Sequence, residues 1–496
     1  MRGQELNSAM RQRTRPIPPL AGGPGRNCCS DCGTANFGDR MLAMAYLRPT
    51  GRNARRKGLQ RALAALVGYC VLPITLAQPE APITGPIVEA AAPAATDTGT
   101  DDRLVTQTDP KEVVAANERL VKSTEQEFGK NSRQSAEAYT DLGNAQRRAG
   151  DHDAAEKSYL SVVEIYRAID GPFSPLVITP LTNLGDNYHE AGDYLEAITV
   201  YSEARTVNRR AFGLLNEDQV PLLDRMTRSF VELNKPAEAD AQQLEALRLI
   251  ERGHAPESDE SLGAIYKYAA WLRESGRFQE ERDQYARALR TIRDTVGKDD
   301  VRQVRPLMGI GNSFRNQRIP EGQGAGALRD ALALLIAQTN PDELAVAEVL
   351  RDLGDWEVAF TKVDYDGAEY RRAWELLGEV PNGEQLRTEW FTGPNYVLRE
   401  PISLRGLSQE PNAPMGHVLV RFNLDKQGHS DNVQVVESNP PGLKDEAVLR
   451  HIRRSRFRPQ IADGEIVSRE ALALQFNYRY TPDALTTQAE GKTRDD

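Results

Sequence analysis

Residues 142–163 read LGNAQRRAGDHDAAEKSYLSVV, and residues 184–205 read LGDNYHEAGDYLEAITVYSEAR. The Leu-Gly pair, the central Gly, an Ala and a Tyr all recur in the second segment after 42 residues. The same step traces further units to about residue 380, and the last of these is displaced by one residue. Self-similarity at a fixed period of this length is typical of stacked helical repeats.

Each period predicts a pair of antiparallel helices that must stack on its neighbours to bury its apolar face. A small residue such as Gly143 lets the two helices approach, and Tyr159 fills the groove against the next pair. Gly150 is placed to end the first helix in a left-handed conformation. In the third and fifth units Gln243 and Ala327 replace the tyrosine, so we expect those units to pack least well.

This pattern resembles the tetratricopeptide repeat, in the 42-residue form found in kinesin light chains. The resemblance covers residues 111–380 and implies a mainly α fold, an α-solenoid that binds proteins or peptides and has no activity of its own. It also implies that the first helix of each unit lines a concave face. In the first two units that face would comprise Glu137, Thr140, Asn144, Arg147, Thr179, Thr182, Asp186 and His189. The alternative is a solvated helix face without a ligand.

Beyond Pro394 the apolar period becomes two. Val418–Leu424 alternates, residues 425–428 (DKQG) predict a hairpin turn, and Val433–Glu437 forms the returning strand. A short helix around residues 443–452 follows, and the final strand alternates over Leu472–Tyr480. The sequence therefore predicts a small α+β (ββαβ) domain with a helix on one face of its sheet.

The terminal segment closely resembles the C-terminal domain of TonB-family proteins. The match includes residues 416–422 (GHVLVRF), Pro440, residues 456–459 (RFRP) and Phe476. The resemblance implies a location in the periplasm of a Gram-negative bacterium and pairing with an extended segment of an outer-membrane receptor or another envelope protein. Such pairing is strand addition at a sheet edge. The strand expected to offer that edge comprises Leu472, Ala473, Leu474, Gln475, Phe476, Asn477, Tyr478, Arg479 and Tyr480.

An export signal is predicted at residues 58–77. Arg55, Arg56 and Lys57 precede Ala62–Ala77, which carries no charge and ends in small residues. Cleaved export is the favoured interpretation, and a retained membrane anchor is the alternative. Residues 1–57 are expected to be a non-globular basic segment, which the simplest interpretation places upstream of the true start. The other expected divisions are a disordered tether at 78–110, the solenoid at 111–380, a linker at 381–412, the terminal domain at 413–480 and a disordered tail at 481–496.

The charge distribution limits the kinds of molecule that the protein can bind. Residues 1–77 carry twelve Lys/Arg against three Asp/Glu, whereas residues 78–496 carry a net charge of −19. A body this acidic is a poor general binder of nucleic acid. The terminal domain nevertheless carries an arginine cluster, which is either a solvated helix face or a contact for an acidic partner or an anionic cell-wall polymer. Its members are Arg453, Arg454, Arg456 and Arg458.

The sequence offers no catalytic or metal-binding pattern, so we expect no catalytic residues, no metal site and no cofactor. There is no G-x-S-x-G, HExxH, P-loop or dinucleotide fingerprint. All four cysteines lie at or before Cys70, and Cys29 and Cys32 supply only two ligands of four. The hypothesis at this point is a periplasmic protein-binding adaptor. Its alternative is a membrane-anchored energy transducer of TonB-dependent transport across the outer membrane.

Overall fold

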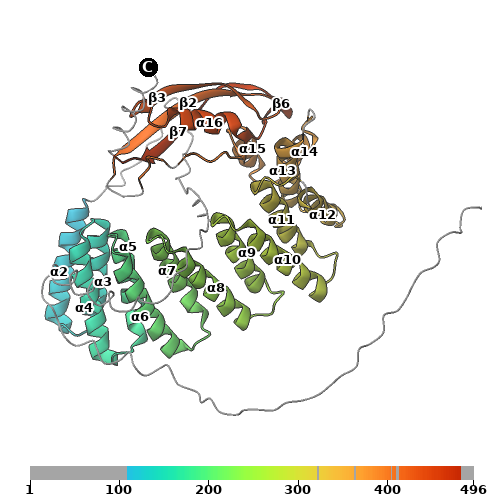
Figure 1. Ribbon diagram of the computed structural model, residues 1–496. Helices are drawn as coiled ribbons and strands as arrows, with labels where there is room; N and C mark the ends of the chain where they lie inside the picture. Colours follow the sequence, from blue (N-terminus) through green and yellow to red (C-terminus); the bar gives the residue numbers. More distant parts are fainter. Residues whose placement is uncertain (1–108, 321–322, 362–364, 404, 409–412, 482–496) are drawn as a thin grey trace, which may run out of the picture. The chain divides into compact units, whose positions relative to one another are not determined.

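The computed structural model describes residues 109–320, 323–361, 365–403, 405–408 and 413–481 (Figure 1). The predicted basic segment, export signal and nearly all of the tether and tail lie outside these described residues. The helices of the repeat segment are α2 (Pro110–Phe128), α3 (Arg133–Arg148), α4 (His152–Asp170), α5 (Ile178–Glu190), α6 (Tyr194–Phe212), α7 (Val220–Glu232), α8 (Pro236–Gly253), α9 (Asp259–Glu274), α10 (Phe278–Thr295), α11 (Val304–Asn316), α12 (Gly324–Ile336), α13 (Glu343–Phe360) and α14 (Ala368–Leu377).

Six helix pairs run from α3/α4 to α13/α14, as the repeat predicts, and the single helix α2 precedes them. In the first five pairs the first helix is followed by a residue with positive φ, because the chain must reverse there, whereas α13 is capped by Thr361 with φ −75°. Gly150 takes φ 77°, its N–H donates to the carbonyl of Arg147, and the next N–H donates to the carbonyl of Gln146. Where the third and fifth units lack this glycine, Asn234 and Arg318 adopt the same conformation.

The predicted contact between small residues and tyrosines forms the core of the pairs. A Cβ atom on Gly143 would lie 2.7 Å from the Tyr159 ring, and one on Gly185 would lie 2.3 Å from the Tyr201 ring. In the third unit the aromatic is absent, and the amide of Gln243 instead donates to Thr227 Oγ1 at 3.0 Å and to Asp224. A polar bond therefore replaces apolar packing at that unit.

Substituting Gly185 by Ala tests this packing. No side chain fits between the helices without moving the Tyr201 ring, so we expect the free energy of unfolding to fall by about 1–3 kcal/mol. The control is Gly326→Ala in α12, where an added Cβ would meet no atom within 4 Å. That change should stabilise the helix by about 0.4–1 kcal/mol. Denaturant unfolding measures both, and equal effects would contradict this account.

The terminal domain has the predicted strand–strand–helix–strand order, with β2 (Met415–Leu424), β3 (Ser430–Asn439), α16 (Asp445–Arg454) and β7 (Arg469–Arg479). These strands form an antiparallel sheet in the order β3-β2-β7. The apolar side of β2 is buried against α16 and Phe457. The buried side chains of β2 and α16 are Val418, Val420, Phe422, Leu424, Val448 and Ile452.

The sequence did not indicate several short elements. These are α15 (Gly383–Phe391), β1 (Tyr396–Leu398), β4 (Arg456–Phe457), β5 (Gln460–Ala462) and β6 (Glu465–Val467). Because α15 and β1 lie in 381–412, that range is not simply a linker. β1 pairs with β4, and Ile461 and Ile466 of the β5–β6 hairpin belong to the same buried cluster as Tyr370 of α14. The last repeat and the terminal domain thus share apolar packing.

Candidate partner-binding surfaces

The outer edge of β7 is the surface expected to add a strand. The N–H of Tyr480 donates to the carbonyl of Pro414 next to β2, whereas the carbonyl of Arg479 accepts from the N–H of Ser408 on the other side. Because the backbone groups of successive strand residues point to opposite sides, those of Ala473, Gln475 and Asn477 face away from β2. Within the described part of the chain, no backbone hydrogen bond is found for these outward groups.

The chain itself occupies one end of this edge. Besides the Ser408 bond of 2.9 Å, the N–H of Thr481 donates to Gly406, and Leu407 forms a bridge with Tyr480. Arg479 and Tyr480 were predicted to contact a partner strand, and this pairing corrects that prediction. The open edge is therefore centred on residues 473–477, which is shorter than the predicted strand.

The side chains of β7 alternate as the sequence predicted. Leu472, Leu474, Phe476 and Tyr478 are half-buried and pack against the core of the terminal domain. Ala473, Gln475 and Asn477 are exposed on the other face, where the Gln475 amide donates to Asn477 Oδ1 at 2.8 Å. The strand is thus held by one face, and its edge remains accessible along residues 473–477.

The arginine cluster divides into exposed and buried members. Arg453 and Arg454 are exposed on α16, and Arg454 lies 3.8 Å from Glu400. Arg456 is half-buried and reaches the carbonyl of Ser455. Arg458, in contrast, is 9% exposed and cannot contact an external anion as predicted, because its guanidinium is already engaged within the chain.

Arg458 binds Asp355 of α13 through two hydrogen bonds of 2.9 Å, from Nε to Oδ1 and from Nη2 to Oδ2. Arg315 of α11 also forms an ion pair with Asp355, and the Tyr370 hydroxyl donates to it at 2.8 Å. Burial would raise the pKa of Asp355, but the charges of Arg458 and Arg315 and these hydrogen bonds hold it well below its usual value. This buried network joins the last helix pair to the terminal domain.

Several predicted concave-face residues hold neighbouring repeats together. Asn144 accepts within its own unit, from the Tyr159 hydroxyl at 2.8 Å, whereas Asp186 accepts from Tyr201 of its own unit at 2.6 Å and from Arg225 of the next unit at 2.9 Å. Other members of the set do the same: Arg147 pairs with Glu190, and His189 Nδ1 lies 2.9 Å from Ser229 Oγ. Thr140 and Thr182 bond the carbonyls four residues before them, and only Glu137 and Thr179 of the eight predicted residues are exposed.

A groove lies further along the stack, at a position for which the sequence predicted no partner-binding residue. It encloses about 870 Å³ between α9, α11 and α13. The guanidinium of Arg305 lies 4.4 Å from the centre of the Tyr266 ring on its wall, and the exposed Arg273 lies beside it. Three steps of 42 residues from Thr140 and Arg147 reach Tyr266 and Arg273. Extending the repeat to the fourth unit would therefore have predicted these two residues.

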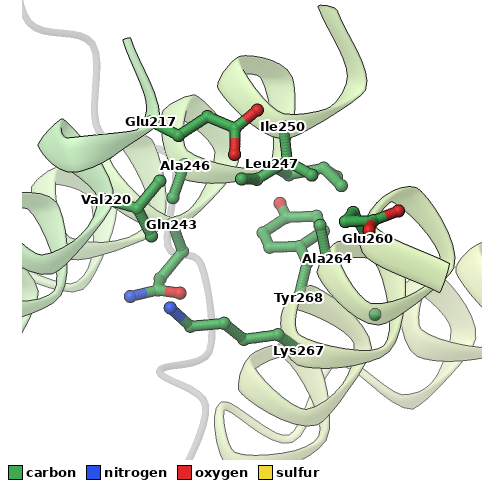
Figure 2. A pocket seen from close by; sticks show the side chains of 11 residues that line it. Glu217, Val220, Gln243, Ala246, Leu247, Ile250, Glu260, Ala264, Lys267 and Tyr268 are labelled. Carbon is green, nitrogen blue, oxygen red and sulfur yellow. The ribbon is translucent and has the colours of Figure 1, made fainter. Parts of the chain in front are cut away.

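A second cavity, of about 310 Å³, lies between α8 and α9 at the junction of the third and fourth units (Figure 2). Its walls are mainly apolar, with Leu247 and Ile250 on α8 and Ala264 and Tyr268 on α9. Lys267 lies at one end and Glu217 at the opposite end (Figure 2). This is the junction that follows the unit in which Gln243 replaces the tyrosine.

Among the described residues, no helix is both long and apolar enough to span a bilayer. The predicted export segment lies outside the part of the chain to which this finding applies. In the same described ranges, no group of three or more His, Cys, Asp or Glu side chains is placed to hold a metal ion.

Two family models match this chain. A tetratricopeptide repeat model matches residues 134–210, and the model of the Gram-negative bacterial TonB protein C-terminal domain matches residues 412–480. Protein TonB from Pseudomonas aeruginosa is 36% identical over 61 residues. That match covers 12% of this chain and 18% of the relative, so the chain spans less than a fifth of that protein's length.

Solved structures similar to this one include BtubC (BKLC) from P. vanneervenii, at 16% identity and TM-score 0.32, with 46% of this chain and 89% of that chain covered. A putative kinesin light chain from Podosopora anserina follows at 15% identity and TM-score 0.32, with 38% and 90% covered. Together with the helix pairs and the β3-β2-β7 sheet, the two family models show that the chain joins a tetratricopeptide-repeat solenoid to a TonB-type C-terminal domain.

Proposed function

We propose that this chain is an exported, non-enzymatic adaptor of the Gram-negative cell envelope. Its repeat segment would hold one protein while its terminal sheet pairs with an extended segment of another. The observation that carries the proposal is the outward-facing backbone of Ala473, Gln475 and Asn477 on β7. Unpaired N–H and C=O groups at a sheet edge are a template for another strand.

The open edge is short, and this limits the affinity of β7 for a partner strand. Three outward residues offer six backbone groups, and each hydrogen bond contributes about 0.5–1.5 kcal/mol net. Such an edge supports weak binding by itself. Attachment to a second binding segment in the same chain raises the effective concentration of the partner, so the adaptor gains avidity from linkage.

Export to the periplasm is part of this proposal. It is supported by the basic residues before Ala62–Ala77 and by the resemblance of the terminal domain to an envelope domain. N-terminal sequencing of the mature protein tests it, and a mature chain that begins at Gln78 is the expected result. A cytoplasmic chain that retains this segment would contradict it.

The second candidate is a membrane-anchored energy transducer in TonB-dependent transport. The match to Protein TonB favours it. In that case Ala62–Ala77 would be retained, and fractionation would recover the chain in the inner membrane with Arg55–Lys57 intact. The adaptor should instead be released with the soluble periplasmic fraction.

Site-specific photocrosslinking in intact cells tests strand addition. A benzophenone side chain at Gln475 should yield a crosslinked partner, because the residue is exposed beside the open edge. The matched control is Gln434, which is exposed on β3 at the other border of the sheet. Equal crosslinking at both positions, or none at Gln475, would contradict strand addition at β7.

Charge reversal on α16 tests the remaining arginines. Because Arg453 and Arg454 are exposed, Arg453→Glu and Arg454→Glu should change the free energy of unfolding by no more than about 0.5 kcal/mol. Both should reduce retention on immobilised polyglutamate in low salt if this face binds acidic partners. The control is Arg329→Glu on α12, also exposed. Equal retention of all three variants and the parent protein would remove this role.

A further inference from the structure

The cavity between α8 and α9 exists because one junction of the stack carries unusually small residues. Its wall on α9 includes the two small residues Gly263 and Ala264. The positions one period earlier are Pro221 and Leu222, and those one period later are Arg305 and Pro306. Leu222 and Pro306 are buried, so larger side chains pack within the stack at both positions equivalent to Ala264. A Cβ atom on Gly263 would meet nothing within 4 Å.

The opposite wall, on α8, also carries a smaller side chain than the equivalent position of other units. Gln243 lines the cavity where Tyr159, Tyr201 and Tyr285 stand in other units, and its amide is held by Thr227 and Asp224. Tyr159 packs with Leu184 of the following helix, and the residue equivalent to Leu184 at this junction is Tyr268, which also lines the cavity. Gln243, Gly263 and Ala264 are thus smaller than the residues one period earlier, Tyr201, Pro221 and Leu222, and all three line the cavity.

The charges around the cavity are unequal. Lys267 Nζ lies 2.6 Å from both carboxylate oxygens of Asp224, so its charge is compensated. At the other end the carboxylates of Glu217 and Glu260 lie 2.6 Å and 3.8 Å from the two ring nitrogens of His254. Two acidic groups thus share one histidine at a rim that is open to solvent, which favours a cation beside the apolar cavity.

We propose that this cavity binds one large apolar side chain of a partner protein, presented by a segment that carries Lys or Arg next to it. A volume of about 310 Å³ is at the lower end of ligand pockets, so it suits a single anchoring side chain rather than a cofactor. A few buried anchors of this kind, aromatic ones above all, carry most of the binding energy of a protein interface. The inference rests on the proposed adaptor role of the repeat segment but does not involve the β7 edge.

The experiment selects peptides against the full chain from a phage-displayed library of random twelve-residue peptides. Counter-selection uses the variant Ala264→Leu, in which the cavity receives the side chain that Leu222 supplies one period earlier. Peptides that survive counter-selection should contain a Phe, Leu or Met flanked by Lys or Arg. A synthetic copy of the most enriched peptide should bind Ala264→Leu at least tenfold more weakly than the parent, in fluorescence anisotropy.

Two matched controls separate cavity filling and charge from general effects. Gly326→Ala on α12, which does not line the cavity, adds a methyl group into open space, so it should keep the affinity within about threefold and raise the melting temperature. Glu260→Gln should weaken binding of the basic peptide severalfold, whereas Glu274→Gln, exposed at the other end of α9, should leave it unchanged. Circular dichroism confirms that each variant is folded.

Three outcomes would overturn the proposal: no peptide surviving counter-selection, a consensus that is acidic or lacks an apolar residue, and equal affinity for Ala264→Leu and the parent. None of these results affects photocrosslinking at Gln475, so failure of the cavity proposal is distinguishable from failure of strand addition.

Discussion

Replacing Asp355 by Asn is expected to lower the free energy of unfolding by about 3–5 kcal/mol, because it removes the carboxylate shared by two buried guanidinium groups. Arg458 contacts Asp355 from the terminal domain and Arg315 contacts it from α11, and the Asp355 side chain is 2% exposed. Asn can still accept from the Tyr370 hydroxyl but supplies no charge. The variant leaves the two cations in a site from which water is excluded.

The control is Glu190→Gln, which breaks the more exposed ion pair with Arg147 and should cost no more than about 1 kcal/mol. Denaturant unfolding, followed by circular dichroism, measures both variants. Because Arg458 belongs to the terminal domain, Asp355→Asn should also separate the unfolding of that domain from that of the last repeats. A cost similar to that of Glu190→Gln would show that the buried network contributes little.

The pH dependence of stability follows from the same group. The pKa of Asp355 is lowered in the folded chain from an ordinary value of 3.8, so the folded state favours the ionised form. Its contribution is therefore fully present above the unfolded pKa and is lost as pH falls through the folded pKa. Between pH 5 and pH 2, the free energy of unfolding should fall more steeply for the parent protein than for Asp355→Asn.

The sequence predicted the repeat architecture because its determinants are local. A glycine that reverses the chain and a tyrosine that faces a small residue lie within one period, as Gly150, Gly143 and Tyr159 show. The terminal sheet was predictable for the same reason, since its strands alternate and the turn between β2 and β3 uses Gly428, which has positive φ. Short strands such as β1 and β4 were missed, because two or three residues carry no measurable period.

The candidate site was less predictable because it depends on contacts between distant segments. Arg458 and Asp355 are 103 residues apart, and nothing in the pattern around Arg458 distinguishes it from the exposed Arg454. Periodicity indicates which face of a helix a residue occupies but not what lies across from it. Asp186 was correctly placed on the first helix of its unit, yet it is engaged by Tyr201 and Arg225 and is not free for a ligand.

Substituting Gln475 by Pro is expected to reduce partner capture by the terminal domain at least about tenfold. Gln475 lies opposite Leu419 of β2, but its own N–H and C=O face the outer edge. Proline removes that outward N–H and places its ring where a partner backbone would approach. The inward N–H groups of Leu474 and Phe476 are untouched, so β7 should stay in the sheet, as proline is tolerated on edge strands.

Crosslinking from a benzophenone side chain at Asn477 measures capture in intact cells. Gln475→Ala is the matched control, since it also loses the side-chain bond to Asn477 but keeps the backbone donor, and it should retain capture. Leu474→Pro removes an inward donor instead and should destabilise the domain. Strand addition requires that Gln475→Pro be folded and inactive while Gln475→Ala is folded and active. If Gln475→Pro captures the partner as well as Gln475→Ala does, recognition depends on side chains and not on the backbone of β7.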